Sequence, residues 1–219
     1  DEGRLDDNTY RMIRRGVLLG STAKQDLKPL LAVLAEDVEA GEAAMAWGIY
    51  TQLVEKQLVE GDLLLEAHLG IARTWIKHEV DHVSAIGRYK IALELAPDSV
   101  KVNYGIALSY LALGDEDAAA PYLAKTLQTQ PDHKDAHSHL DAVLVRMYNR
   151  ATELTWEDAT RAEGIKLLQR METLDPNLGD IQLELGKAYQ WDGDRTAASS
   201  AYSKGLRAQR FWDETRRSK

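Results

Sequence analysis

The sequence predicts an all-α protein built from helical hairpins that repeat along the chain. Two prolines, Pro97 and Pro131, lie 34 residues apart, and each ends a helical run of apolar residues and is followed by Asp. Gly-Asp pairs at 114–115 and 193–194 separate two further pairs of helical runs. One Phe, five Pro and few β-branched runs argue against an all-β fold. A helix, a Gly-Asp turn, a second helix and a Pro-Asp link form a unit of about 34 residues, and stacking such units produces a solenoid.

Composition excludes several classes of function. The 219 residues contain no Cys, which removes Cys nucleophiles, Cys-ligated zinc and iron–sulfur clusters. The net charge of −8 argues against a nucleic-acid partner, because such binding depends on Lys and Arg at the phosphates. No run of apolar residues is long enough to span a membrane, so we expect a soluble chain. The first residue is Asp1 rather than Met, which leaves open an upstream signal peptide or anchor, and both cytoplasm and periplasm remain open.

Local signals place the helix ends. A Gly that ends the first helix of a hairpin tolerates a left-handed backbone, and the Asp after it caps the second helix by accepting backbone N–H bonds. Spacings of three and four between apolar residues then fix the buried face of each helix. The run of 13 residues that ends at Asp98 shows this pattern, as do those that end at Asp132 and Asn177.

The residues at these repeat positions resemble the tetratricopeptide repeat (TPR) family. The family's pattern is a small pair, an aromatic residue, Gly, Ala, a bulky residue and Pro. In the third copy these positions hold, in that order, Ile106-Ala107, Tyr110, Gly114, Ala119, Leu123 and Pro131. The last copy carries Leu185-Gly186, Tyr189, Gly193, Ala198 and Tyr202. The resemblance implies about five helix-turn-helix repeats in a right-handed superhelix, with the recurring Tyr residues used for packing. It also implies a concave groove lined by the first helix of each repeat.

The resemblance divides the chain into a capping helix, repeats and a tail. The second copy has about three extra residues between its helices, and the fourth copy has an insertion of about eleven. The insertion predicts a longer first helix and a longer loop, with Thr155 as the cap of the next helix. The predicted parts are a capping helix at 1–26, a TPR domain at 27–210 and a basic tail at 211–219. The copies within that domain are 27–61, 62–97, 98–133, 134–176 with the insertion, and 177–210.

The family's groove positions give the candidate partner-binding residues. They predict a mostly apolar groove with isolated charges at Lys101, Arg146 and Lys187. Trp75 and Trp191 could anchor a partner or could equally be wedged between repeats. TPR domains that hold chaperone C-termini use Lys and Asn at positions that are Leu31, Ala35, Ala67 and Ile71 here, so that role is not expected. The family's groove positions also include Val145 and Asp180. The residues selected as the candidate partner-binding set are Leu64, Ile71, Thr74, Trp75, Lys101, Tyr104, Leu108, Leu111, Ser138, Ala142, Arg146, Leu183, Lys187, Gln190 and Trp191.

Two histidine-containing segments have the spacing of metal ligands. Residues 78–82 spell His-Glu-Val-Asp-His, and two His four residues apart on one helix can bind zinc beside a Glu general base. The Asp within this motif and the lack of a familiar third ligand argue that His78 and His82 sit at a solvated helix end instead. His133, His137 and His139 form a second group, for which surface positions or a partner contact are expected.

These observations favour a protein–protein adaptor that holds a peptide or helix segment of a partner protein and helps to assemble a larger complex. Bacterial TPR proteins of this size often act so. No catalysis, cofactor or nucleic acid is expected. Two alternatives stay open: a metal-dependent hydrolase that uses His78 and His82, and a self-assembling scaffold in which a basic C-terminus packs on the acidic body of a neighbour. The residues of that basic C-terminus are Arg195, Lys204, Arg207, Arg210, Arg216, Arg217 and Lys219.

Overall fold

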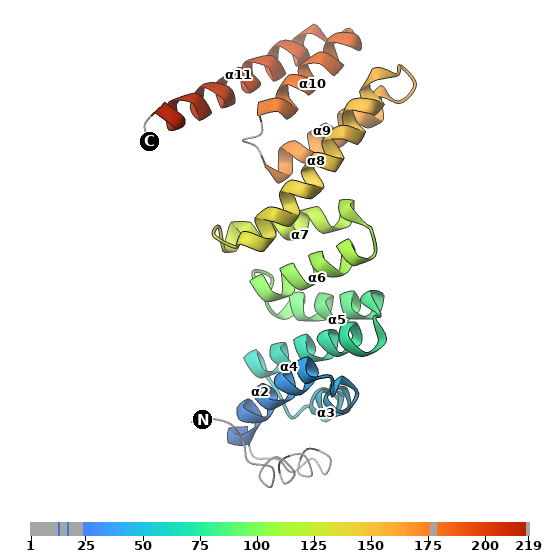
Figure 1. The fold of residues 1–219 in the computed structure, drawn as a ribbon, viewed down its shortest axis with the longest axis vertical. Coiled ribbons are helices and arrows are strands. Elements are labelled where there is room, and N and C mark those ends of the chain that lie inside the picture. Colours follow the sequence, from blue (N-terminus) through green and yellow to red (C-terminus); the bar gives the residue numbers. More distant parts are fainter. Residues whose placement is uncertain (1–12, 14–16, 18–23, 176–178, 218–219) are drawn as a thin grey trace. The chain divides into compact units, whose positions relative to one another are not determined.

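A computed structural model of the protein describes residues 13, 17, 24–175 and 179–217, with side chains described for 13, 17, 26–175 and 179–207. All regular structure in these residues is helical, so the predicted all-α class is confirmed (Figure 1). No helix in the described part of the chain combines the length and apolarity that a membrane crossing needs. The chain divides into two compact units, Asp1–Pro131 and Asp132–Lys219.

Each unit is built from antiparallel helix pairs that follow one another along the chain (Figure 1). In unit 1 the pairs are α2 (Lys24–Ala40) with α3 (Ala43–Glu55), α4 (Gly61–Thr74) with α5 (His82–Leu95), and α6 (Val100–Ala112) with α7 (Glu116–Thr129). A short π-helix, η1 (Trp75–Glu79), continues from the end of α4. In unit 2 the pairs are α8 (Lys134–Trp156) with α9 (Arg161–Leu174), and α10 (Gly179–Trp191) with α11 (Arg195–Arg217).

The two Gly-Asp turns have the backbone that the sequence predicts. Gly114 and Gly193 adopt φ values of +75° and +83°, in the left-handed region that Gly enters without a steric penalty. Asp115 then accepts a hydrogen bond from the Ala118 amide at 2.9 Å, and Asp194 accepts one from Ala197 at 2.9 Å. Each carboxylate satisfies a backbone donor that the first turn of its helix would otherwise leave open.

Removal of the cap on α7 should have a measurable cost. We expect Asp115→Ala to lower the free energy of unfolding by about 1 kcal/mol, because the Ala118 amide loses its acceptor. Asp115→Asn keeps a capping oxygen and should unfold like the parent in urea. Equal loss in both variants would mean that the charge, rather than the hydrogen bond, stabilises this helix.

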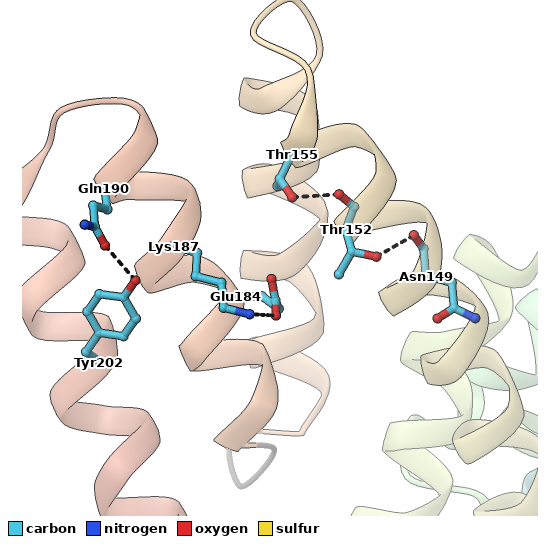
Figure 2. Close-up of polar contacts among 7 residues, drawn as sticks. All are labelled: Asn149, Thr152, Thr155, Glu184, Lys187, Gln190 and Tyr202. Carbon is cyan, nitrogen blue, oxygen red and sulfur yellow. Dashed lines mark hydrogen bonds and ion pairs between the residues drawn. The ribbon is translucent and has the colours of Figure 1, made fainter.

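The predicted cap at Thr155 is wrong. Thr155 lies inside α8, where its hydroxyl donates to the Thr152 carbonyl at 2.9 Å, and Thr152 donates in turn to the Asn149 carbonyl at 2.8 Å (Figure 2). The insertion lengthens α8 to 23 residues, and Thr160 is the residue that precedes α9. The predicted longer loop is also wrong, because only residues 157–160 separate the two helices. Thr is readily accommodated here because its hydroxyl bonds to a carbonyl of the preceding helical turn.

The predicted packing role of the repeat tyrosines is clearest in unit 1. Tyr50 on α3 is 2% exposed and its ring lies against Gly70 on α4. Tyr89 on α5 is 4% exposed and lies against Gly105 on α6. Gly at both positions lets the ring approach the backbone of the next helix closely, because any Cβ would overlap the ring.

The ends of the chain are only partly described. Ile13 and Val17, within the predicted capping helix, are buried in the core formed with α2, α3 and α4. The rest of the capping segment up to residue 23 lies outside the described residues. At the other end the backbone of α11 remains helical to Arg217, through most of the segment predicted as a basic tail.

Candidate functional site

The first helices of the two hairpins in unit 2 carry a hollow of about 340 Å³. We call it the acidic pocket. Its base is formed by buried apolar side chains such as Leu144, Met171 and Ile181, while Val145 at its rim is 59% exposed. A hollow of this size lies at the small end of the range of ligand pockets and can take one large side chain of a partner. Its lining residues are Asp141, Leu144, Val145, Tyr148, Met171, Asp180 and Ile181.

Carboxylates surround the apolar floor of the acidic pocket. Asp141 and Asp180 line it, and Glu184 lies one turn further along α10. Partial burial, together with the charge of Glu184 and a hydrogen bond to it, raises the pKa of Tyr148 to about 12. Tyr148 is therefore a neutral hydrogen-bond donor to Glu184 at physiological pH. The site combines an apolar surface with an excess of negative charge.

The sequence predicts isolated charges in the groove at Lys101, Arg146 and Lys187, but two of these side chains form ion pairs. Lys187 forms an ion pair with Glu184 on the same helix (Figure 2), and Lys101 pairs with Glu66 on α4 at 2.9 Å. Both ammonium groups are thus partly neutralised by neighbouring carboxylates. Arg146, the third predicted charge, is exposed on α8.

In unit 1, two predicted groove residues are buried. Ile71 and Thr74 are each only 1% exposed, and the Thr74 hydroxyl donates to the Ile71 carbonyl at 2.7 Å. Ile71 packs into the core formed with α2 and α3, because this face of α4 is covered by the first hairpin. Leu108 on α6 is 38% exposed and Lys101 is also exposed, and the other predicted positions, Leu64, Trp75, Tyr104 and Leu111, are half-buried.

In unit 2 most predicted groove residues reach the surface. Leu183 is half-buried, and Gln190 accepts a hydrogen bond from the Tyr202 hydroxyl at 3.0 Å (Figure 2). The remaining positions are exposed: Ser138, Ala142, Arg146, Lys187 and Trp191. Two lining residues of the acidic pocket, Val145 and Asp180, lie at groove positions that the resemblance predicts. The rest of its lining was not predicted, and Met171 comes from α9, which carries no groove position.

The structure separates the two tryptophans that the sequence left undecided. Trp191 is 45% exposed, with the ring of Trp156 at 5.6 Å and the Arg161 guanidinium 5.9 Å over its own ring. Trp75 is half-buried, packs against the cores on both sides of it, and meets Trp47 edge-to-face at 6.0 Å. Trp191 thus keeps part of its ring exposed, while Trp75 is partly wedged between hairpins.

The His-Glu-Val-Asp-His segment does not form a continuous helix. His78 and Glu79 end η1, Val80 adopts a left-handed φ of +53°, and His82 begins α5. Asp81 caps α5 by accepting the Ser84 amide at 3.0 Å, and its hydrogen bonds with Ser84 lower the pKa of Asp81. The arrangement of two imidazoles on one helix face, which a zinc peptidase motif needs, is therefore not present at His78 and His82.

No set of three or more His, Asp or Glu side chains in the described ranges is grouped so that it could hold a metal ion. In the second histidine group, His133 caps α8, and its Nδ1 accepts the Ala136 amide at 3.2 Å. His137 is exposed and His139 is half-buried on the first turns of α8. The local role of His133 is thus in helix capping.

No family model matches this chain, and no curated protein matches it. Similar solved structures include MamA RS-1, 18% identical, which covers 87% of this chain and 99% of its own with a TM-score of 0.47. YrrB, described as a TPR protein with an unusual peptide-binding site, is 16% identical and covers 83% of this chain and 85% of its own, with a TM-score of 0.44. The TPR-type fold described here is inferred from the chain itself, from the order of its hairpins and from its Tyr–Gly contacts.

Proposed function

We propose that this protein is an interaction module that binds an amphipathic segment of a partner protein on the first helices of its hairpins. It has no catalysis of its own and helps to assemble a larger complex. The acidic pocket is the single observation that carries this proposal. It offers an apolar floor, an exposed Val145 at the rim, and two carboxylates, Asp141 and Asp180.

The chemistry of the acidic pocket indicates the kind of segment that would bind. A helix laid across two helices places apolar side chains at spacings of three and four, and one of them fills a pocket of this size. The carboxylates at the rim favour Lys or Arg beside that apolar anchor. The proposed partner is therefore an amphipathic helix with one large apolar residue flanked by basic ones.

A charge placed at Val145 should test this proposal. Because Val145 is 59% exposed, Val145→Lys should leave the free energy of unfolding nearly unchanged. It puts a positive charge against both the apolar anchor and the basic flanks of the bound segment. Ala162→Lys adds the same charge at an exposed position on α9 and is the matched control. Affinity capture from the source cells, quantified by mass spectrometry, should return a partner with the parent and with Ala162→Lys. Val145→Lys should reduce its recovery about tenfold or more.

Photo-crosslinking gives a second readout that does not depend on stable capture. A benzoyl-phenylalanine at 145 should crosslink the same partner, and one at 162 should not. If the parent and the two charge variants recover equal amounts of the partner, the proposal is contradicted and the binding site lies on another surface. Capture of only this chain would instead favour self-assembly, which light scattering at increasing protein concentration would establish.

A further inference from the structure

A second hollow, also of about 340 Å³, lies in unit 1 between α3 and the end of α4. We call it the tryptophan pocket. Its walls include the rings of Trp47 and Trp75, which meet edge-to-face with centroids 6.0 Å apart. The remaining lining residues are Ala44, Thr74, His78 and Glu79. It lies away from the acidic pocket in sequence and shares no residue with it.

The extra residues of the second repeat build one side of this pocket. They form the wider turn of η1, which carries Trp75 at its start and His78 and Glu79 at its end. Val80 then holds a left-handed backbone at φ +53°, which is strained for a β-branched residue. Single π-turns and strained residues recur at functional sites, so this segment of the His-Glu-Val-Asp-His motif invites a functional explanation.

The tryptophan pocket combines two features that attract a cation. The face of an indole ring carries negative electrostatic potential and binds cations better than the other aromatic rings. The Glu79 carboxylate adds a formal negative charge, and its side chain is 57% exposed, so it stands at the mouth rather than in the core. Trp47 is 41% exposed, which leaves part of its ring open to a ligand.

The polar groups of the pocket distinguish between kinds of cation. A primary ammonium needs acceptors for three N–H donors and is strongly hydrated. The lining offers few acceptors: one oxygen of Glu79 already lies 3.2 Å from His78 Nδ1, and Thr74 is 1% exposed and bonded to Ile71. A quaternary ammonium has no N–H donors to satisfy and is weakly hydrated. Its methyl groups can rest on the indole rings while Glu79 balances its charge.

From this geometry we infer that the tryptophan pocket binds a quaternary ammonium group, with Trp47 and Trp75 as its aromatic walls and Glu79 as its counter-ion. The tryptophan pocket shares no residue with the acidic pocket, so either proposal can fail without the other.

Choline and its uncharged analogue 3,3-dimethylbutan-1-ol provide the test, because they have nearly the same shape and differ in charge. The full chain is titrated at constant ionic strength, and the indole N–H resonances of its tryptophans are followed by NMR. We expect choline to shift the resonances of Trp47 and Trp75 and to bind about tenfold more tightly than the alcohol. Equal affinity for the two compounds would overturn the inference, as would equal affinity for butylammonium.

Two variants and a control test the assignment of the walls and the counter-ion. Trp47→Ala should abolish the response to choline, and Glu79→Gln, which keeps the shape of the side chain, should weaken it about threefold. Trp156→Ala removes an exposed tryptophan from unit 2 and should bind choline like the parent. Binding that survives Trp47→Ala in a folded protein would contradict the proposed site.

A further comparison identifies whether the quaternary ammonium group belongs to a protein side chain or to a free small molecule. A short peptide that contains trimethyllysine is compared with free choline and with the same peptide carrying unmodified lysine. A peptide affinity at least tenfold above that of choline would identify a methylated side chain of a protein as the ligand. Equal affinity of the trimethyllysine peptide and choline would identify a free small molecule. A lysine peptide that binds as tightly as the methylated one would overturn the inference.

Discussion

The substitution Gly164→Ala should lower the free energy of unfolding by about 3 kcal/mol, since it forces a side chain between two helices in backbone contact. A Cβ at position 164 would lie 2.6 Å from Thr155 Cγ2 and 2.9 Å from both the Ala151 carbonyl oxygen and the Thr155 amide nitrogen. A side chain can rotate away from such a contact, but the backbone of α8 can yield only if the whole helix shifts. The α8–α9 pair therefore depends on this Gly.

Urea unfolding followed by circular dichroism measures this effect, and hydrogen exchange of α8 and α9 locates it. Gly48→Ala is the matched control, because a Cβ there meets nothing within 4 Å. Ala is the better helix former, so the control should be stabilised by up to about 1 kcal/mol. Thr155→Ser in the Gly164→Ala background should recover only part of the loss, because it removes the methyl contact and leaves the backbone contacts. A parent-like unfolding curve for Gly164→Ala would contradict the close approach of the two helices.

The hairpins could be predicted from the sequence because their ends depend on local chemistry. A left-handed Gly114 followed by Asp115 specifies a helix end and a helix start within two residues, whatever the rest of the chain does. Tertiary packing then only has to bring together helices whose lengths are already set. The TPR-type order of helices was predictable for this reason.

The candidate sites were less predictable because they depend on which side chains meet. The pairing of Lys187 with Glu184 carries a signal in the sequence, since charges three residues apart on a helix are neighbours. The pairing of Lys101 with Glu66, 35 residues away, carries none. The tryptophan pocket likewise needs Trp47 and Trp75 to meet across two helices, at a π-turn that no residue propensity predicts.

The predicted cap, Thr155, lies five residues before Thr160, which precedes α9, and this error has a different cause. Thr155 is a good capping residue, and the sequence offered no reason for α8 to continue past it. The helix continues because Thr155 and Ala151 are buried against α9, with Thr155 1% exposed, so packing outweighs the local capping preference.

Tyr50 and Gly70 should show the strongest energetic coupling in unit 1. Tyr50→Ala alone is expected to cost about 3–5 kcal/mol, since it empties a site that is 2% exposed. Gly70→Ala alone should cost about 1–3 kcal/mol, because its Cβ would lie 2.2 Å from Tyr50 Cζ. In the Tyr50→Ala background the ring is gone, so Gly70→Ala should be neutral or stabilising by up to about 1 kcal/mol through helix propensity.

The change of sign is the informative result, because it separates a specific contact from a general sensitivity of α4 to substitution. A double-mutant cycle measured by urea unfolding should give a coupling of about 2 kcal/mol or more between the two positions. The cycle of Tyr50→Ala with Gly87→Ala, on α5 with open space at its Cβ, should be additive. If Gly70→Ala costs the same with and without the Tyr50 ring, then the ring does not set the distance between α3 and α4. In that event the Gly would be required by the backbone of α4 itself, and the Tyr–Gly contact would not be the device that joins one hairpin to the next.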